Sequence, residues 1–203
     1  EYGRQQDLYS NTWMNFRKTV TLDQVPESVV AKIAVDSRYW LYINGEMVVF
    51  EGQLKRGVNR TDTFYDNVEL APYLHEGENT IAVLAWFWGK GGQSYSNNDS
   101  GKAGFLFEAE FGNQLVVSDS SWKVMRSPGY MKQIGDGTGG GHNGLPNYRL
   151  PEYNVYFDAR VLEEAGTEFW YTEDFDDSAW SNATELGAAP CEPWNDLHPR
   201  SIP

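Results

Sequence analysis

The side chains best suited to contact a ligand occur in a stretch with no regular hydrophobic period. Residues 89–102, GKGGQSYSNNDSGK, are mostly Gly, Ser and Asn, a composition that predicts a loop. The amides of Asn97 and Asn98 and the carboxylate of Asp99 can hydrogen-bond to neighbouring hydroxyl groups, and Tyr95 adds an aromatic face. These types favour a ligand with vicinal hydroxyls, although the same polar residues also form ordinary turns.

A second long stretch has a similar character. Residues 135–153, GDGTGGGHNGLPNYRLPEY, place His142, Asn143 and Tyr148 among glycines that allow close approach to a ligand. The run lacks the G-K-[ST] ending of a phosphate loop and follows no strand-to-helix transition, which argues against a nucleotide site. Loops of 14 and 19 residues are long for a compact domain and are usually functional or mobile.

Two tryptophans precede the first loop and have two interpretations. Trp86 and Trp88 end a nearly continuous apolar run over residues 76–88. As exposed rings they would stack on the apolar C–H faces of a sugar, and as buried rings they would belong to the core. The sequence contains 8 Trp, 12 Tyr and 10 Phe, most of which a large β-core would absorb, so both interpretations stay open.

Metal and catalytic chemistry are weakly supported. Asp99 and Asp136 carry hard oxygen donors that could ligate Ca²⁺, but their spacing is not that of an EF-hand. Cys191 is the only cysteine, which excludes an internal disulfide, and the three histidines lack zinc-ligand spacing. The acidic residues of YTEDFDD, 171–177, are interpreted as a solvated surface. We assign no catalytic residue and no metal ligand.

The overall charge limits the class of partner. The formal charge of −13 repels phosphate backbones and anionic lipid, which argues against nucleic-acid and membrane-surface roles. No run of 18 apolar residues is present, so we expect no membrane insertion.

Short apolar or alternating segments recur every 10 to 15 residues, which is typical of an all-β protein. We predict an antiparallel β-sandwich of the jelly-roll or galactose-binding-domain-like type, formed by residues 1–180 with the two long loops. Residues 181–203 contain four prolines and are predicted to be an extended exit segment toward a following domain. The predicted strands lie at 14–22, 26–35, 38–50 (a hairpin turning at Asn44-Gly45), 62–74, 76–88, 103–111, 113–119, 122–127 and 154–162.

Taken in order, the motifs resemble the N-terminal β-sandwich of bacterial α-L-rhamnosidases and similar multidomain glycoside hydrolases. The likeness covers nearly the whole chain. Its motifs are FRK (16–18), YWLYING (39–45), YDNVEL (65–70), GENTIAV (77–83), VYFDAR (155–160), DFDDSAW (174–180) and the residues from 194 to 203.

The resemblance implies that this domain does not catalyse a reaction. In that family the acid and base carboxylates lie in a later (α/α)₆ barrel, so this chain is expected to be a non-catalytic accessory domain. It would pack against the downstream catalytic domain of the same polypeptide, and would bind carbohydrate, including rhamnose-containing glycans, in some modules with Ca²⁺. The resemblance also implies a secreted, periplasmic or cell-surface bacterial protein.

Two alternatives remain at this point. The domain could be an interdomain scaffold that binds no ligand. It could also be a self-sufficient glycosidase, which would need two carboxylates in one cleft, such as Asp99 with Asp136 or Asp158. The simpler expectation for Asp158 is a buried ion pair with Arg160.

Overall fold

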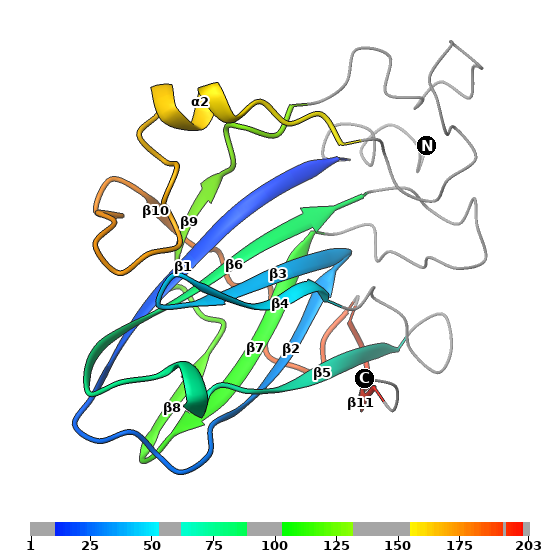
Figure 1. Ribbon diagram of the computed structural model, residues 1–203. Helices are drawn as coiled ribbons and strands as arrows, with labels where there is room; N and C mark the ends of the chain where they lie inside the picture. The colour runs from blue at the N-terminus through cyan, green and yellow to red at the C-terminus, as the bar shows by residue number, and fades with distance from the viewer. Residues whose placement is uncertain (1–10, 53–61, 89–102, 132–154, 193, 201–203) are drawn as a thin grey trace.

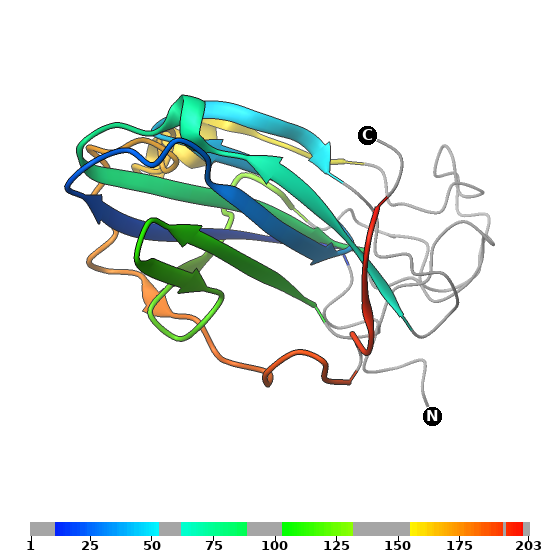
Figure 2. The same cartoon turned by 90° about the horizontal axis from the view of Figure 1, so that it is seen from below.

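The computed structural model describes residues 11–52, 62–88, 103–131, 155–192 and 194–200. In these ranges the chain forms two β-sheets that lie face to face (Figure 1), and the turned view shows the two layers edge-on (Figure 2). The predicted all-β sandwich is therefore confirmed.

One sheet has six strands and the other has five, and neighbouring strands are antiparallel except β11 and β5, which are parallel. The six-stranded sheet runs in the order β10 (Ser181–Asn182), β9 (Lys123–Arg126), β1 (Thr12–Leu22), β6 (Gly77–Phe87), β3 (Arg38–Ile43) and β4 (Glu46–Gly52). The five-stranded sheet runs in the order β11 (Leu197–Pro199), β5 (Thr63–Glu69), β2 (Val30–Asp36), β7 (Gly104–Phe111) and β8 (Gln114–Val117). Two short helices, η1 (Ala71–Tyr73) and α2 (Ala159–Glu164), complete the described elements.

The sequence of strand β6 is apolar at nearly every position because both faces of the strand are buried. Successive side chains of a strand point to opposite faces. Ile81 and Val83 therefore enter the core between the sheets, whereas Ala82 and Leu84 enter a second apolar cluster on the outer face. A strand buried on both faces has no position for an alternating polar residue.

The hairpin between β3 and β4 has the predicted turn. Asn44 and Gly45 have φ angles of 52° and 85°, the two positive values that a type I′ turn requires. Asn tolerates this region because its short side chain can hydrogen-bond locally, and Gly has no Cβ to clash.

The predicted strand at 154–162 is wrong. Among its described residues, 155–162, the segment has only an isolated bridge between Phe157 and Tyr130, and helix α2 follows. The Asp158 side chain accepts a hydrogen bond from the backbone N–H of Arg160, so Asp158 is the N-cap, which is a helix-start signal. The expected pairing of Asp158 with Arg160 does occur, but the Arg160 side chain is 82% exposed, so the pair is not buried.

The described residues after 180 are built into the sandwich. β10 extends one sheet and β11 extends the other. Trp194 is buried, and its carbonyl accepts a hydrogen bond of 2.8 Å from the hydroxyl of Thr63. Arg200 pairs with the buried carboxylate of Asp66 at 2.8 Å. That this segment also leads to a following domain stays a prediction.

Tight packing around Tyr39 gives a test of the core. A Cβ at Gly52 would overlap the Tyr39 ring, which is fully buried and held by a 2.8 Å hydrogen bond from its hydroxyl to Asp66. We expect Gly52→Ala to lower the free energy of unfolding by about 3 kcal/mol or more in urea denaturation. The matched control is Gly45→Ala, where positive φ alone should cost about 1 kcal/mol. Equal losses in the two variants would contradict this packing.

Candidate functional site

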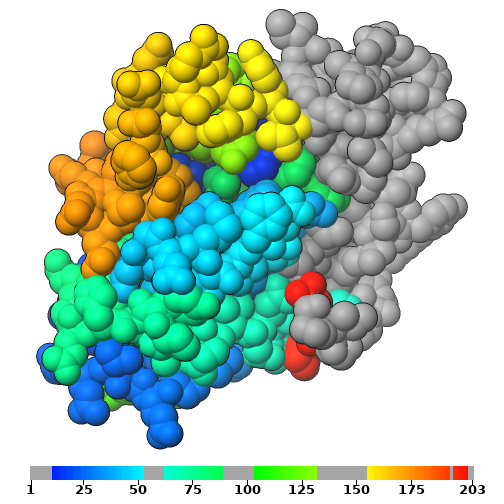
Figure 3. Space-filling model, viewed as in Figure 1, coloured from blue at the N-terminus to red at the C-terminus, as the bar shows by residue number. Residues whose placement is uncertain are grey.

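The outer face of the six-stranded sheet carries a large aromatic cluster. Residues 155–180 pass over this face, and Figure 3 shows the yellow and orange atoms of that segment packed beside the cyan β3–β4 hairpin. Bulky rings therefore lie between the sheet and residues 155–180, which we call the cover. The buried members of this outer-face cluster are Trp13, Trp40, Ala82, Leu84, Trp86, Trp88, Trp170 and Trp180.

Stacked rings fill the centre of the outer-face cluster. The ring centroids of Trp13 lie 4.4 Å from Trp86, 5.2 Å from Trp40 and 3.8 Å from Tyr130, with near-parallel planes for Trp86 and Tyr130. Such large apolar areas are removed from water together, so the cover is held to the sheet by hydrophobic burial as well as by polar contacts.

Of the nine residues predicted to contact carbohydrate, two lie in the described ranges, and both are buried. Trp86 is 3% exposed and Trp88 is 0% exposed, so in the described structure their rings serve as core rather than as open stacking faces. Trp86 donates its indole N–H to the side chain of Asn11 at 2.9 Å. The remaining seven lie outside the described residues: Tyr95, Asn97, Asn98, Asp99, His142, Asn143 and Tyr148. The Ca²⁺ candidates Asp99 and Asp136 also lie outside them.

A buried arginine fixes the cover in place. Arg17 is 2% exposed, and its Nε donates to the carboxylate of Asp177 at 2.9 Å. Its guanidinium also donates to the carbonyl oxygens of Trp170, Thr172 (2.8 Å) and Phe175 (3.2 Å). A planar guanidinium with five N–H donors can satisfy all four of these acceptors at once, whereas an ammonium has only three donors. The loop over residues 170–177 is therefore tied to the centre of strand β1.

The acidic segment is not simply a solvated surface, as the sequence suggested. Asp177 is the partner of buried Arg17, and Glu173 pairs with His75 at 2.7 Å. Sequence reasoning could have found the first contact, because a charged residue inside a strand that buries alternate positions requires a partner. The register of β1 makes Arg17 such a residue.

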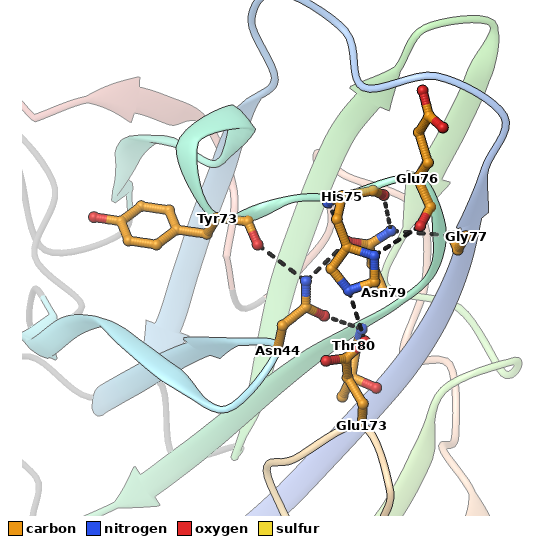
Figure 4. A network of polar contacts seen from close by, with 8 residues as sticks. All are labelled: Asn44, Tyr73, His75, Glu76, Gly77, Asn79, Thr80 and Glu173. Carbon is orange, nitrogen blue, oxygen red and sulfur yellow. Dashed lines mark hydrogen bonds and ion pairs between the residues drawn. The ribbon is translucent and has the colours of Figure 1, made fainter.

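A second polar network joins the hairpin to the same cover (Figure 4). The Asn44 side chain donates to the Tyr73 carbonyl at 3.0 Å and to Asn79 at 2.8 Å, and it accepts from the Thr80 backbone N–H at 2.7 Å. The His75 backbone N–H donates to the Asn79 side chain at 3.0 Å, and the Asn79 amide donates back to the His75 carbonyl at 2.8 Å. The hairpin turn at Asn44 and the start of strand β6 at Asn79 are thus joined by hydrogen bonds into one corner of the domain.

Beside this cover lies an open cleft of about 740 Å³ at the β9 edge of the sheet. One wall comes from the ends of strands β1 and β9, and the other comes from the turn after α2 and the residues before β10. Its lining residues are Met14, Val124, Met125, Arg126, Ala165, Gly166, Thr167, Asp174, Phe175, Asp176, Ala179, Trp180 and Ser181.

The cleft combines apolar rings with polar groups that remain available. Phe175 is half-buried, and Trp180 is 8% exposed. Within the described ranges, the side chains of Arg126 and Asp174 make no hydrogen bond or ion pair, and every other described Lys or Arg makes at least one. Asp176 accepts a hydrogen bond of 2.9 Å from the backbone N–H of Ser178, and this bond lowers the pKa of its carboxyl below the usual range. A mixture of this kind suits a small polar ligand better than a purely apolar one.

Two further observations concern the described part of the chain. No three His, Cys, Asp or Glu side chains in it lie together as metal ligands would. Its helices are also too short to span a bilayer.

Comparison with known proteins shows the class of fold to which the chain belongs. No family model and no curated protein matches the sequence. A lectin from Pleurotus ostreatus, solved with GalNAc, is similar over 93% of this chain and 41% of its own, with a TM-score of 0.53 and 16% identity. At that identity the likeness shows the fold alone, a β-sandwich shared with a sugar-binding protein.

The particular likeness is to rhamnosidases. The GH78 family rhamnosidase of Bacillus sp. GL1 matches 96% of this chain with a TM-score of 0.76 and 28% identity. The Streptomyces avermitilis alpha-L-rhamnosidase, solved with L-rhamnose, matches 94% with a TM-score of 0.56 and 22% identity. The chain spans only 19% and 14% of their lengths. The expected resemblance to a domain of α-L-rhamnosidases is confirmed.

The role of Arg17 can be tested by a substitution that keeps the charge. In Arg17→Lys the ammonium cannot reach Asp177 and three carbonyl groups together, so the loop loses bonds and a charge stays buried. We expect the free energy of unfolding to fall by about 3–5 kcal/mol in urea denaturation. The control is Arg160→Lys, whose side chain is 82% exposed beside Asp158, and which should leave the free energy of unfolding nearly unchanged. A loss in Arg17→Lys as small as in the control would contradict the anchoring role.

The His75–Glu173 contact predicts a pH effect. The carbonyl of Glu76 and then the carboxylate of Glu173 raise the pKa of His75 above its ordinary value of 6.5. Because the folded pKa is the higher one, the stabilisation is complete below pH 6.5 and is lost as pH rises through the folded value. NMR titration of the imidazole should show Glu173→Gln lowering this pKa only part-way, since the Glu76 carbonyl remains. Glu76→Gln, which keeps that carbonyl, serves as the control, and an unchanged pKa in Glu173→Gln would refute the contact.

Proposed function

We propose that this chain is a non-catalytic accessory domain of a multidomain glycoside hydrolase, an α-L-rhamnosidase, and that it binds carbohydrate for that enzyme. The observation that carries the proposal is the likeness to the Bacillus sp. GL1 rhamnosidase, which covers 96% of this chain and 19% of the other. A domain that accounts for so small a share of an enzyme is more simply an accessory part than the seat of the reaction.

The described side chains support the same role. Catalysis by a glycosidase needs two carboxylates across a scissile bond, one of them with a raised pKa to act as an acid. The cleft holds Asp174 and Asp176, and the pKa of Asp176 is lowered rather than raised. Aromatic rings beside charged side chains, by contrast, are what sugar recognition needs. We propose further that the enzyme is bacterial and that it acts on its glycan outside the cytoplasm.

A scaffold role without ligand is the second candidate, and a specific surface favours it. Apolar side chains on both sides of α2 are exposed, namely Val155 and Tyr156 at 51%, Phe157 at 44% and Phe169 at 63%. Large exposed apolar side chains of this kind are often found at interaction sites. Packing against a catalytic domain would cover them, and the two roles are compatible, because the cleft lies at the β9 edge.

Titration calorimetry separates the two candidates. We expect L-rhamnose or a rhamnose-containing oligosaccharide to give saturable heat with the isolated chain, and added Ca²⁺ with an EDTA control shows whether a metal takes part. A parallel assay with an aryl rhamnoside should show no cleavage by this chain alone. The absence of heat with every glycan up to tens of millimolar would leave the scaffold role and reject carbohydrate binding.

A further inference from the structure

We propose that the cleft at the β9 edge is a binding site for one neutral sugar residue, with Arg126, Asp174 and Asp176 holding its hydroxyls and Phe175 contacting its apolar face. This inference rests on the proposed function and names the site where it would operate. None of these residues was among the nine candidates that the sequence suggested.

The size of the cleft fits such a ligand. A volume of about 740 Å³ lies within the range of roughly 300–1,000 Å³ that is usual for small-molecule sites. A single pyranose fills only part of that space, so the open side leaves room for the rest of a glycan chain. An open cleft of this kind is suited to the end of a chain or to a side branch.

The charges in the cleft select the chemistry of the ligand. A guanidinium only donates hydrogen bonds, and a carboxylate only accepts them. Arg126 lines the same cleft as Asp174 and Asp176, so a ligand that contacts all three must accept a hydrogen bond at one position and donate at others, as hydroxyl groups do. An anionic ligand would be repelled by two carboxylates on a chain of formal charge −13, and a cationic one would face Arg126.

The apolar part of the cleft completes this set. Phe175 is half-buried in the wall of the cleft, and its ring is packed against two neighbours. The Arg17 guanidinium lies 5.2 Å from the Phe175 ring centroid, and the Trp180 ring lies edge-on to it at 5.5 Å. A ring held in this way can contact the C–H face of a sugar without losing side-chain freedom on binding.

The backbone that carries the polar groups is fixed before a ligand arrives, and the side chains of Arg126 and Asp174 have no partner among the described residues that a ligand would have to displace. Arg126 stands on strand β9, which is paired with β1. Asp176 is oriented by the Ser178 backbone N–H, and the Trp180 backbone N–H donates to the Asp177 carbonyl at 2.9 Å. Since Arg17 binds Asp177, the anchor of the cover also positions the cleft wall. Preorganised groups lose less entropy on binding and give tighter complexes.

The test uses NMR of the isotope-labelled chain titrated with L-rhamnose, D-galactose, D-glucose and D-mannose, each up to tens of millimolar. We expect at least one sugar to cause saturable shifts concentrated in the backbone amides of residues 124–126, 165–167 and 174–181. Arg126→Gln and Asp174→Asn should each weaken binding by about tenfold or more, since each removes a hydrogen bond to a charged group. Asp176→Asn keeps an oxygen acceptor for the Ser178 N–H, so its loss of affinity would report the ligand rather than the turn.

Matched controls are available at exposed positions away from the cleft. Lys32→Gln and Asp23→Asn remove charges of the same signs from the surface and should leave the affinity within about twofold, because both side chains are exposed and neither lines the cleft. Urea denaturation of every variant separates lost folding from lost binding.

Three results would overturn the proposal, and they differ in what else they reject. Saturable shifts located elsewhere, or unchanged affinity in the Arg126 and Asp174 variants, would reject this site and leave the proposed function intact. A complete absence of sugar binding by the wild-type chain would reject both.

Discussion

A guanidinium group buried under a loop is the constraint around which this structure is arranged. Arg17 lies in the middle of the longest strand pairing of the six-stranded sheet, and its donors are used by one carboxylate and three carbonyl groups of the segment above. A buried charge that lost these partners would cost several kcal/mol, so the loop and the strand must form together. The position of the loop in turn sets the position of the cleft wall.

The same cover gives the sandwich a second apolar layer. The first core lies between the sheets, and the outer-face cluster lies between the six-stranded sheet and residues 155–180. Strand β6 contributes to both, which accounts for its burial from Asn79 to Phe87. A single-cored sandwich would expose one face of this strand to water, so the tryptophans found here are required by the fold before any role in recognition is considered.

The comparison with lectins and rhamnosidases fits this arrangement. Proteins that share the sandwich at low identity keep its layers, whereas binding depends on individual side chains at loops and edges. In this chain the described part of the surface offers two distinct regions, the cleft with Arg126 and the exposed apolar side chains on both sides of α2. One suits a small polar ligand and the other suits a protein surface, as the proposed accessory role requires.

The sequence by itself determined the sandwich, the Asn44-Gly45 turn and the family resemblance, because strand alternation and turn chemistry are local properties of the chain. It left Trp86 and Trp88 open between core and surface, since burial depends on what covers the strand, and the cover comes from residues more than 60 positions later. It mistook residues 154–162 for a strand, because a short apolar run fits either element and the N-cap at Asp158 decides. The cleft could not be predicted, since Arg126 and Asp174 line it from segments about 50 residues apart whose relative position is set only by the tertiary structure, in which Arg17 binds Asp177.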